Sequence, residues 1–189
     1  MRCLLITPIN LITPIILISV NGCATQGTSP PASQPAAAPA TIPTTGPAKI
    51  AEFQGPYRYL SNFWPAEVEF DGIRYPTVEH AYQSAKSLNP NDRRRIAALP
   101  TPADAKREGR ALTLRADWEQ VKFDVMEQCV RYKFTHHPDL ADQLLATGDA
   151  ILEEGNTWND RVWGVYQGQG ENHLGKILMK VREELRNRR

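Results

Sequence analysis

Three polar side chains of one predicted helix have the types and the spacing that catalysis requires. Glu79, Gln83 and Lys86 are spaced i, i+4 and i+7, so a helix over 78–86 presents all three on one face. A carboxylate on such a face can activate water or stabilise positive charge as it develops. The alternative is a solvated face with an ordinary Glu/Lys spacing, and the pattern alone does not separate the two.

A loop rich in glycine, asparagine and tryptophan, residues 155–172, holds a second candidate set. Trp158 and Trp163 offer rings on which a flat base can stack, and Asp160 lies between them. Glycines then lead to the last predicted helix, which starts near Asn172. Free backbone N–H groups at a helix start suit a phosphate, although a flexible glycine connector would show the same pattern.

A third segment, Ser61-Asn62-Phe63, places an aromatic ring beside two side chains that can hydrogen-bond the edge of a stacked ring. A core-forming turn is the alternative interpretation of this segment.

Several other motifs favour structural roles. His80 follows Glu79 and points to another side of the helix. Cys129 lies among apolar positions at helical spacing and is predicted to be a core residue. The pair at 136–137 lacks a third ligand, so no metal site is predicted. The arginines at 93–95 are expected on a solvated helix face, not on a nucleic-acid patch.

Apolar spacing and turn signals predict the elements that position these residues. Asp71-Gly72 lies between two alternating segments and indicates a hairpin, and Thr77 is a suitable N-cap for the helix that carries Glu79. Further helices are expected over 92–99, 102–108 (stopped by Gly109), 118–134 (capped by Asp117), 138–147 and 174–188, with a possible strand over 151–153. The fold class is therefore α+β, a mainly helical single domain with a small β-sheet.

The first 49 residues differ from the rest of the chain. No charged residue lies between Arg2 and Lys49, and an apolar run from Cys3 to Val20 is followed by Asn21-Gly22-Cys23, which resembles a bacterial lipobox. This order predicts a signal peptide over 1–22 with lipidation of Cys23. A Pro/Ala-rich disordered tether over 23–49 follows, and the folded domain is expected over 50–189.

The protein is thus expected at the cell envelope, lipid-anchored and facing the periplasm or the exterior. A plain export signal, an uncleaved anchor, or a mis-called start before a cytoplasmic protein are the alternatives.

Composition limits the partners. The 22 Lys and Arg residues nearly balance the 21 Asp and Glu residues, so the formal net charge is +1. We therefore expect no stable binding to nucleic acid, and membrane contact only through the lipid anchor. Three scattered cysteines predict neither a disulfide framework nor a zinc site. The oligomeric state is not predicted.

Four segments in this order resemble the NADAR family, which includes YbiA-like N-glycosidases linked to riboflavin-pathway intermediates. They are Leu60–Phe63, Tyr75–Gln83 with Lys86, Trp163-Gly164, and Gly170–Gly175 with Ile177–Met179. The similarity covers Phe53 to Arg186. Trp64 stands where tyrosine is common, and Glu171 stands where a basic residue is frequent. The export-like N-terminus departs from a mainly cytosolic family.

The resemblance implies hydrolysis of a ribosyl C–N bond without a cofactor. Breaking this bond places positive charge on the ribose, which a carboxylate can stabilise while it activates water. The predicted catalytic residues are Glu79, Asp160 and Trp163, with either carboxylate facing the ribose and Trp163 stacking on the base. The predicted substrate-binding residues are Ser61, Asn62, Phe63, Lys86, Gly164 and Asn172, with Arg58 or Arg74 as further phosphate ligands.

The predicted substrate is a ribosylated, phosphate-bearing small molecule of the riboflavin-pathway ribosylamino-pyrimidine type. Two alternatives remain open. One is an ADP-ribosyl hydrolase that acts on modified bases or nucleic acid, for which an open groove lined with Arg and Lys is expected. The other is a non-catalytic module that binds ADP-ribose or NAD, in which the two carboxylates need not share a pocket.

Overall fold

A computed structural model describes residues 46–189. The predicted signal peptide, Cys23 and residues 23–45 of the predicted tether lie outside the described residues. In chain order the elements are β1 (Lys49–Ile50), the 3-10 helix η1 (Gly55–Leu60), β2 (Val68–Phe70), β3 (Ile73–Tyr75), α1 (Val78–Ser84), α2 (Pro90–Ala97), α3 (Pro102–Ala111), α4 (Trp118–His136), α5 (Pro138–Ala146), β4 (Ile151–Leu152), β5 (Gly155–Asn156), β6 (Val165–Tyr166) and α6 (His173–Arg186).

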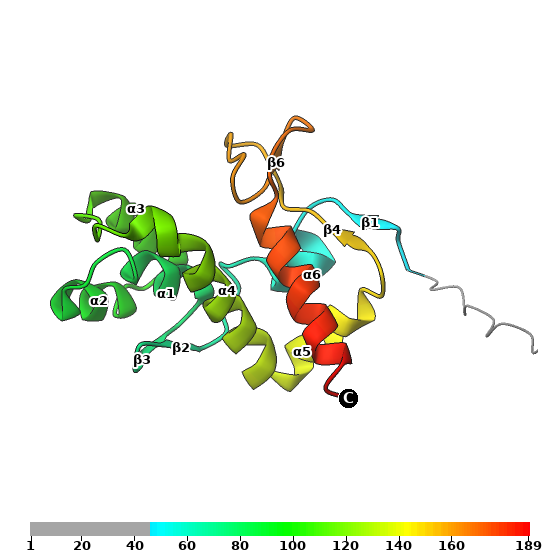
Figure 1. The fold of residues 1–189 in the computed structure, drawn as a ribbon, viewed down its shortest axis with the longest axis horizontal. Helices are drawn as coiled ribbons and strands as arrows, with labels where there is room; N and C mark the ends of the chain where they lie inside the picture. The colour runs from blue at the N-terminus through cyan, green and yellow to red at the C-terminus, as the bar shows by residue number, and fades with distance from the viewer. Residues whose placement is uncertain (1–45) are drawn as a thin grey trace, which may run out of the picture. The chain divides into compact units, whose positions relative to one another are not determined.

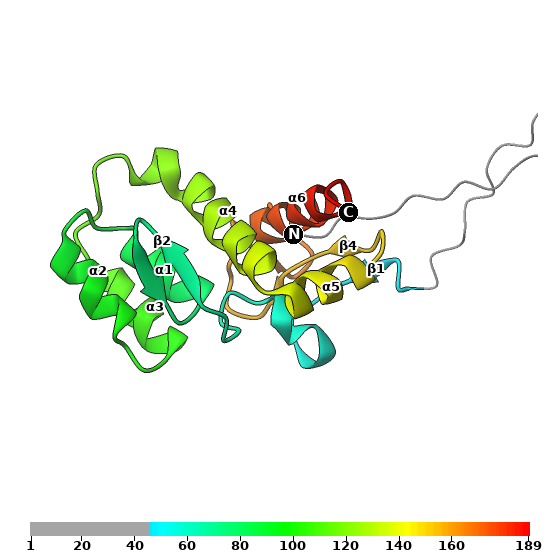
Figure 2. The ribbon, with the colours of Figure 1, turned by 90° about the horizontal axis from the view of Figure 1, so that it is seen from below.

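Helix α4 is the central element of the described domain. In both ribbon views it lies between the group formed by α1, α2 and α3 and the pair formed by α5 and α6 (Figures 1 and 2). Its predicted apolar stripe is buried at Val125 and Cys129, and Val121 and Tyr132 pack partly buried against the same core. Cys129 is fully buried and is a core residue, as expected, and this burial raises the pKa of its thiol.

Within residues 46–189, the strands form three separate two-stranded sheets. The hairpin of β2 and β3 is antiparallel, and its turn residues Asp71 and Gly72 both have positive φ, as the Asp-Gly signal predicted. β1 pairs in parallel with β4, and β5 pairs in parallel with β6. The α+β class is confirmed, but the strand segments do not join into the single sheet that was expected.

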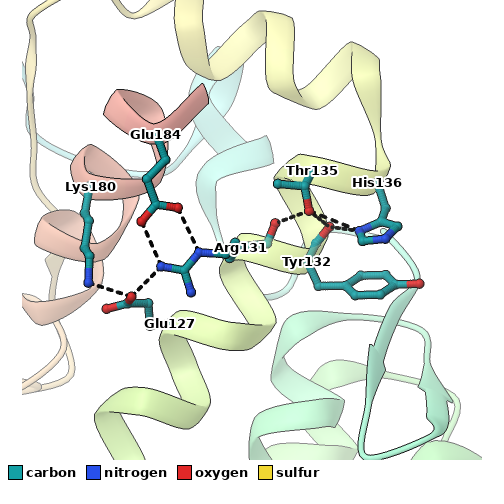
Figure 3. Close-up of polar contacts among 7 residues, drawn as sticks. All are labelled: Glu127, Arg131, Tyr132, Thr135, His136, Lys180 and Glu184. Carbon is teal, nitrogen blue, oxygen red and sulfur yellow. Dashed lines mark hydrogen bonds and ion pairs between the residues drawn. The ribbon is translucent and has the colours of Figure 1, made fainter. Parts of the chain in front are cut away.

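Charged side chains tie α4 to α6. Arg131 donates from Nε and Nη2 to the two carboxylate oxygens of Glu184, each at 2.8 Å, and also reaches Glu127 (Figure 3). Lys180 donates to the same Glu127 oxygen at 2.7 Å. A bidentate guanidinium–carboxylate pair holds geometry better than a single contact does. The network therefore holds α6 in register against α4.

Three local predictions are wrong in instructive ways. Arg93 is not solvated: it is buried, donates to the Ser87 carbonyl oxygen and pairs with Asp71 at 2.7 Å. Asp117 precedes α4, but its carboxylate binds Arg115 and makes no cap. Helix α3 does not stop before Gly109 but continues through it to Ala111. In each case a tertiary or neighbouring contact overrides the local rule.

None of the helices between residues 46 and 189 combines the length and the apolar character needed to cross a bilayer.

Candidate active site

One cavity of about 490 Å³ collects most of the predicted site residues. Its walls come from η1 and the segment after it, from α1, α3 and α4, and from the loop after β4. Its lining includes the carboxyl groups of Glu79, Glu154 and Asp160, the cations Arg58, Lys86, Lys106 and Arg110, and the aromatic rings of Phe63, Tyr82, Trp158 and Trp163. A volume of this size accommodates a nucleotide-sized molecule.

The polar face of α1 forms one wall of this cavity. Thr77 caps the helix as predicted, accepting from the backbone N–H of His80. Glu79 and Gln83 are only 5% and 4% exposed, so the solvated-face interpretation is wrong. Gln83 Nε2 donates to Glu79 Oε1 at 2.9 Å. Burial raises the pKa of Glu79, and the hydrogen bond from Gln83 and the charge of Lys106 oppose that rise.

A glycine allows α3 to approach this face. A Cβ atom at Gly109 would overlap the side-chain amide of Gln83. Gly109 therefore lies inside α3 because the close approach to α1 requires it, not because the helix ends there. The Oε1 atom of Gln83 is buried without a hydrogen-bond partner among the described residues, so the amide is held by packing and by Glu79.

His80, the neighbour of Glu79, has the structural role that was expected. Its Nδ1 lies 2.8 Å from Thr77 Oγ1, and its Nε2 lies 3.2 Å from the carbonyl oxygen of Leu99. Both ring nitrogens are thus used within the fold, and the ring is not part of the cavity lining. Within residues 46–189, no three His, Cys, Asp or Glu side chains gather as metal ligands would.

Four cations line the cavity. Lys86 and Arg58 were proposed from sequence, whereas Lys106 and Arg110 of α3 were missed. Arg74, the other proposed phosphate ligand, lies on the exposed hairpin beside Glu67 and Glu69 instead. The i, i+4 spacing of Lys106 and Arg110 could have identified a basic face, but only the packing of α3 on α1 directs it into the cavity.

These cations crowd one another. Burial lowers the pKa of Lys86, the nearby Arg110 and Lys106 lower it further, and Glu79 opposes the effect. Like charges gathered in a partly buried space make an anion a favourable ligand. This part of the cavity can therefore bind a phosphate.

Asp160 and Trp163 belong to one turn of the loop after β5. Asp160 Oδ1 accepts hydrogen bonds from the backbone N–H groups of Val162 at 3.1 Å and of Trp163 at 2.8 Å. Asn156 closes the turn from the other side, donating to the Asp160 carbonyl oxygen at 2.7 Å. The hydrogen bond from the Trp163 backbone thus fixes Asp160 and Trp163, two of the predicted catalytic residues, relative to each other.

The aromatic rings of the cavity occupy two environments. Trp163 is half-buried and packs edge-on against Tyr82, with ring centroids 5.3 Å apart, and against Phe123 at 5.3 Å. Trp158, in contrast, is 54% exposed. Lys106 Nζ lies 5.8 Å from the Trp158 ring centroid and 5.7 Å from that of Phe63. A flat base can therefore contact the half-buried rings of Trp163 and Phe63 and the exposed ring of Trp158.

Hydrogen bonds to its backbone hold the segment 61–63 in the cavity wall. The backbone N–H of Glu79 donates to the Asn62 carbonyl oxygen at 3.1 Å, which joins this segment to α1. Lys133, buried on α4, donates to the carbonyl oxygen of Ser61 at 2.9 Å and to that of Tyr59 at 2.6 Å. Ser61, Asn62 and Phe63 all belong to the lining, so this predicted group is assembled with the others.

Two predicted substrate-binding residues lie outside the cavity lining. Asn172, in a left-handed conformation at the start of α6, uses its side chain within the fold: Oδ1 accepts from the Glu154 backbone N–H at 3.1 Å, and Nδ2 donates to the Leu152 carbonyl oxygen at 2.9 Å. Gly164 packs closely against the backbone of Glu154, where a Cβ would overlap the carbonyl oxygen. Both residues thus support the wall that carries Glu154.

Glu154 is the carboxyl group of the cavity that sequence reasoning missed. It directly follows the predicted strand segment 151–153, beside Glu153, whose carboxylate pairs with Lys49 at 2.8 Å. Adjacent residues of an extended segment point in opposite directions, so one of the two glutamates is expected to face inward. That alternation is the signal available in the sequence, but it does not say which one.

Comparison with known proteins agrees with this fold. The NADAR domain family matches residues 50–186. An N-glycosidase of Nostoc punctiforme is 43% identical over 138 residues, covering 70% of this chain and 88% of the relative. The N-glycosidase YbiA of Escherichia coli is 43% identical over 134 residues, covering 68% of this chain and 82% of the relative.

A riboflavin biosynthesis protein of Vibrio vulnificus is 39% identical over 130 residues, which are 67% of this chain but 35% of that longer protein. The NMR structure of Escherichia coli YbiA superposes with a TM-score of 0.66 at 38% identity, covering 74% of this chain and 84% of that one. The chain belongs to the NADAR domain family, as its motifs predicted.

Proposed function

We propose that this protein is an N-glycosidase that hydrolyses the bond between ribose and a base in a ribosylated, phosphate-bearing small molecule of the ribosylamino-pyrimidine type. The observation that carries the proposal is the meeting of Glu79, Asp160 and a cluster of cations in one cavity. Two relatives at 43% identity are named N-glycosidases, and a third is named a riboflavin biosynthesis protein, which supports the same class.

The chemistry assigns a role to each part of the cavity. Departure of the base leaves positive charge on the ribose, and the buried carboxylate of Glu79 stabilises that charge and accepts a proton from the attacking water. Lys86, Lys106 and Arg110 bind the phosphate. Trp163, held by the Asp160 turn, stacks on the base and fixes its orientation.

The residues of the cavity favour hydrolysis of a small substrate over the two alternative functions. Glu79 and Asp160 share one pocket, which favours catalysis over simple binding of ADP-ribose or NAD. The cations line the same cavity as the carboxyl groups. An enzyme acting on modified nucleic acid is expected to carry its basic residues along a groove beside the pocket.

The test is base release by the purified full chain. A ribosylamino-pyrimidine 5′-phosphate is incubated with the protein, and free base is measured by chromatography. We expect release by the wild type, and a loss of at least about 100-fold in kcat for Glu79→Gln, because the variant keeps the shape but loses the charge. Glu119→Gln on the exposed surface of α4 is the matched control and keeps wild-type activity. Equal rates for Glu79→Gln and wild type would refute this assignment.

We also propose, from the sequence alone, that the protein is exported and anchored through a lipid on Cys23. Replacing Cys23 by Ser is expected to move the protein from the membrane fraction to the aqueous fraction. Cys3→Ser, within the predicted leader, is the matched control and leaves the distribution unchanged. Recovery of the wild type in the cytoplasmic extract would contradict the export signal and favour a later start.

A further inference from the structure

Glu154 is fixed in the cavity wall by its backbone and not by its side chain. Its N–H donates to Asn172 Oδ1 at 3.1 Å, and its carbonyl oxygen accepts from the backbone N–H of Val165 at 2.9 Å. The side chain lines the same cavity as Glu79 and Asp160. The main chain thus holds this third carboxyl group at the site independently of its protonation state.

The three carboxyl groups differ in their partners. Glu79 accepts a hydrogen bond from Gln83, and Asp160 accepts two from the backbone of its own turn. No hydrogen bond or ion pair from any side chain within residues 46–189 reaches the Glu154 carboxyl group. The Glu154 side chain is half-buried, and a carboxyl group that is partly removed from water and lacks a donor is shifted toward its protonated form.

The charges around Glu154 and Glu79 also differ. Burial raises the pKa of Glu154 to about 7, the carboxylates of Asp160 and Glu79 contribute to the rise, and Lys106 opposes it. Burial also raises the pKa of Glu79, but Lys106, Lys86, Arg110 and the amide of Gln83 all favour its ionised form. The two carboxyl groups therefore differ in their neighbours: a hydrogen-bond donor and three cations favour the ionised form of Glu79, whereas only Lys106 does so at Glu154.

We infer that Glu154 is a further catalytic residue, the general acid that delivers a proton to the departing base. This inference rests on the proposed N-glycosidase function. The C1′–N bond breaks with its electron pair moving to nitrogen, and that nitrogen takes the proton from the Glu154 carboxyl group. Water adds its oxygen to C1′ and gives a proton to the Glu79 carboxylate. Glu79 then releases this proton to solvent and Glu154 regains one, so the net reaction consumes one water molecule.

The kinetic test compares Glu154→Gln with Glu153→Gln in the full chain. Glu153 is the adjacent glutamate, but its carboxylate faces Lys49 and lies outside the cavity lining, so this variant should behave as wild type. We expect Glu154→Gln to lose at least about 100-fold in kcat with little change in KM, because proton transfer typically contributes that much. The alkaline limb of the wild-type pH–rate profile should be absent from the variant.

A wild-type kcat for Glu154→Gln, or an alkaline limb that persists in it, overturns the inference. So does a result in which Glu79→Gln, and not Glu154→Gln, abolishes the alkaline limb, because the acid would then be Glu79.

A second measurement needs no substrate, and it uses a variant only to assign a resonance. Glutamate labelled with ¹³C at the side-chain carboxyl lets NMR follow the ionisation of Glu154 in the wild-type chain, with the resonance assigned from Glu154→Gln. A midpoint above pH 6 is expected, and a midpoint below pH 5 overturns the inference. This measurement also distinguishes failure of the proposed function from failure of the inference on Glu154. Absence of base release by the wild type refutes the proposed function, whereas the titration alone decides whether Glu154 holds a proton.

Discussion

Asp160 Oδ1 accepts a hydrogen bond from the backbone N–H of Trp163 at 2.8 Å, so one predicted catalytic residue positions another. The same oxygen accepts from Val162, which makes the carboxylate the centre of the turn. Asp160 was predicted as one of two carboxylates that could face the ribose, and only its Oδ2 atom is free of these backbone bonds. Its charge also acts at a distance, because it raises the pKa of Glu154.

Two substitutions of Asp160 should separate its hydrogen bonds within the turn from the effect of its charge on the pKa of Glu154. Asp160→Asn keeps a carbonyl oxygen for the turn and removes the charge, so its melting temperature is expected to match wild type. Loss of the negative charge lowers the pKa of Glu154, so the alkaline limb of the pH–rate profile should move to lower pH. Asp160→Ala removes the acceptor as well and should destabilise the fold by about 1 kcal/mol.

Thermal unfolding and pH–rate profiles of both variants check these effects. An unchanged alkaline limb in Asp160→Asn would show that the charge of Asp160 does not act on the proton that limits the rate.

Gly109→Ala is expected to damage the site from outside the cavity. In an ordinary helix this change stabilises by up to about 1 kcal/mol. Here the new methyl group overlaps the Gln83 amide, so we expect destabilisation of about 1–3 kcal/mol and reduced kcat as Gln83 shifts away from Glu79.

The double variant Gly109→Ala with Gln83→Ala removes the overlap with the Gln83 amide, leaves only the Cβ atom of residue 83 at 2.8 Å, and serves as the control. Denaturant unfolding of the wild type, both single variants and the double variant gives the coupling between the two positions. Additive effects would contradict direct contact as the cause.

Local signals in the sequence predicted most of the elements but only part of the site. Glu79, Gln83 and Lys86 were found because helical spacing alone places them on one face. Lys106 was missed because its direction depends on how α3 packs against α1, and the glycine that permits that packing was interpreted as a helix stop. Glu154 was missed because its role depends on what surrounds it in space, including residues 75 positions earlier in the chain, and not on its neighbours in sequence.

The buried amine of Lys133 should make stability depend on pH. Burial lowers the pKa of Lys133 to about 7, and a neutral amine has two N–H donors, which match its two acceptors, the carbonyl oxygens of Tyr59 and Ser61. In the unfolded chain the same amine keeps its proton up to its ordinary pKa of 10.5. Between these values the unfolded state binds more protons, so this group makes the fold more stable as pH rises from 7 to about 10.

Lys133→Met removes this contribution and leaves the two carbonyl oxygens without their donor. The free energy of unfolding, measured with denaturant at several pH values, should therefore rise more steeply with pH in the wild type than in the variant, by at most about 1.4 kcal/mol per pH unit. Because Ser61 and its neighbours lose their support, KM should also increase. Arg131→Met, two residues earlier in α4 and part of the α4–α6 network of Figure 3, is the control: it should lower stability by a similar amount at every pH in this range. Parallel pH dependences for wild type and Lys133→Met would mean that the buried amine keeps its proton and is charged in the fold.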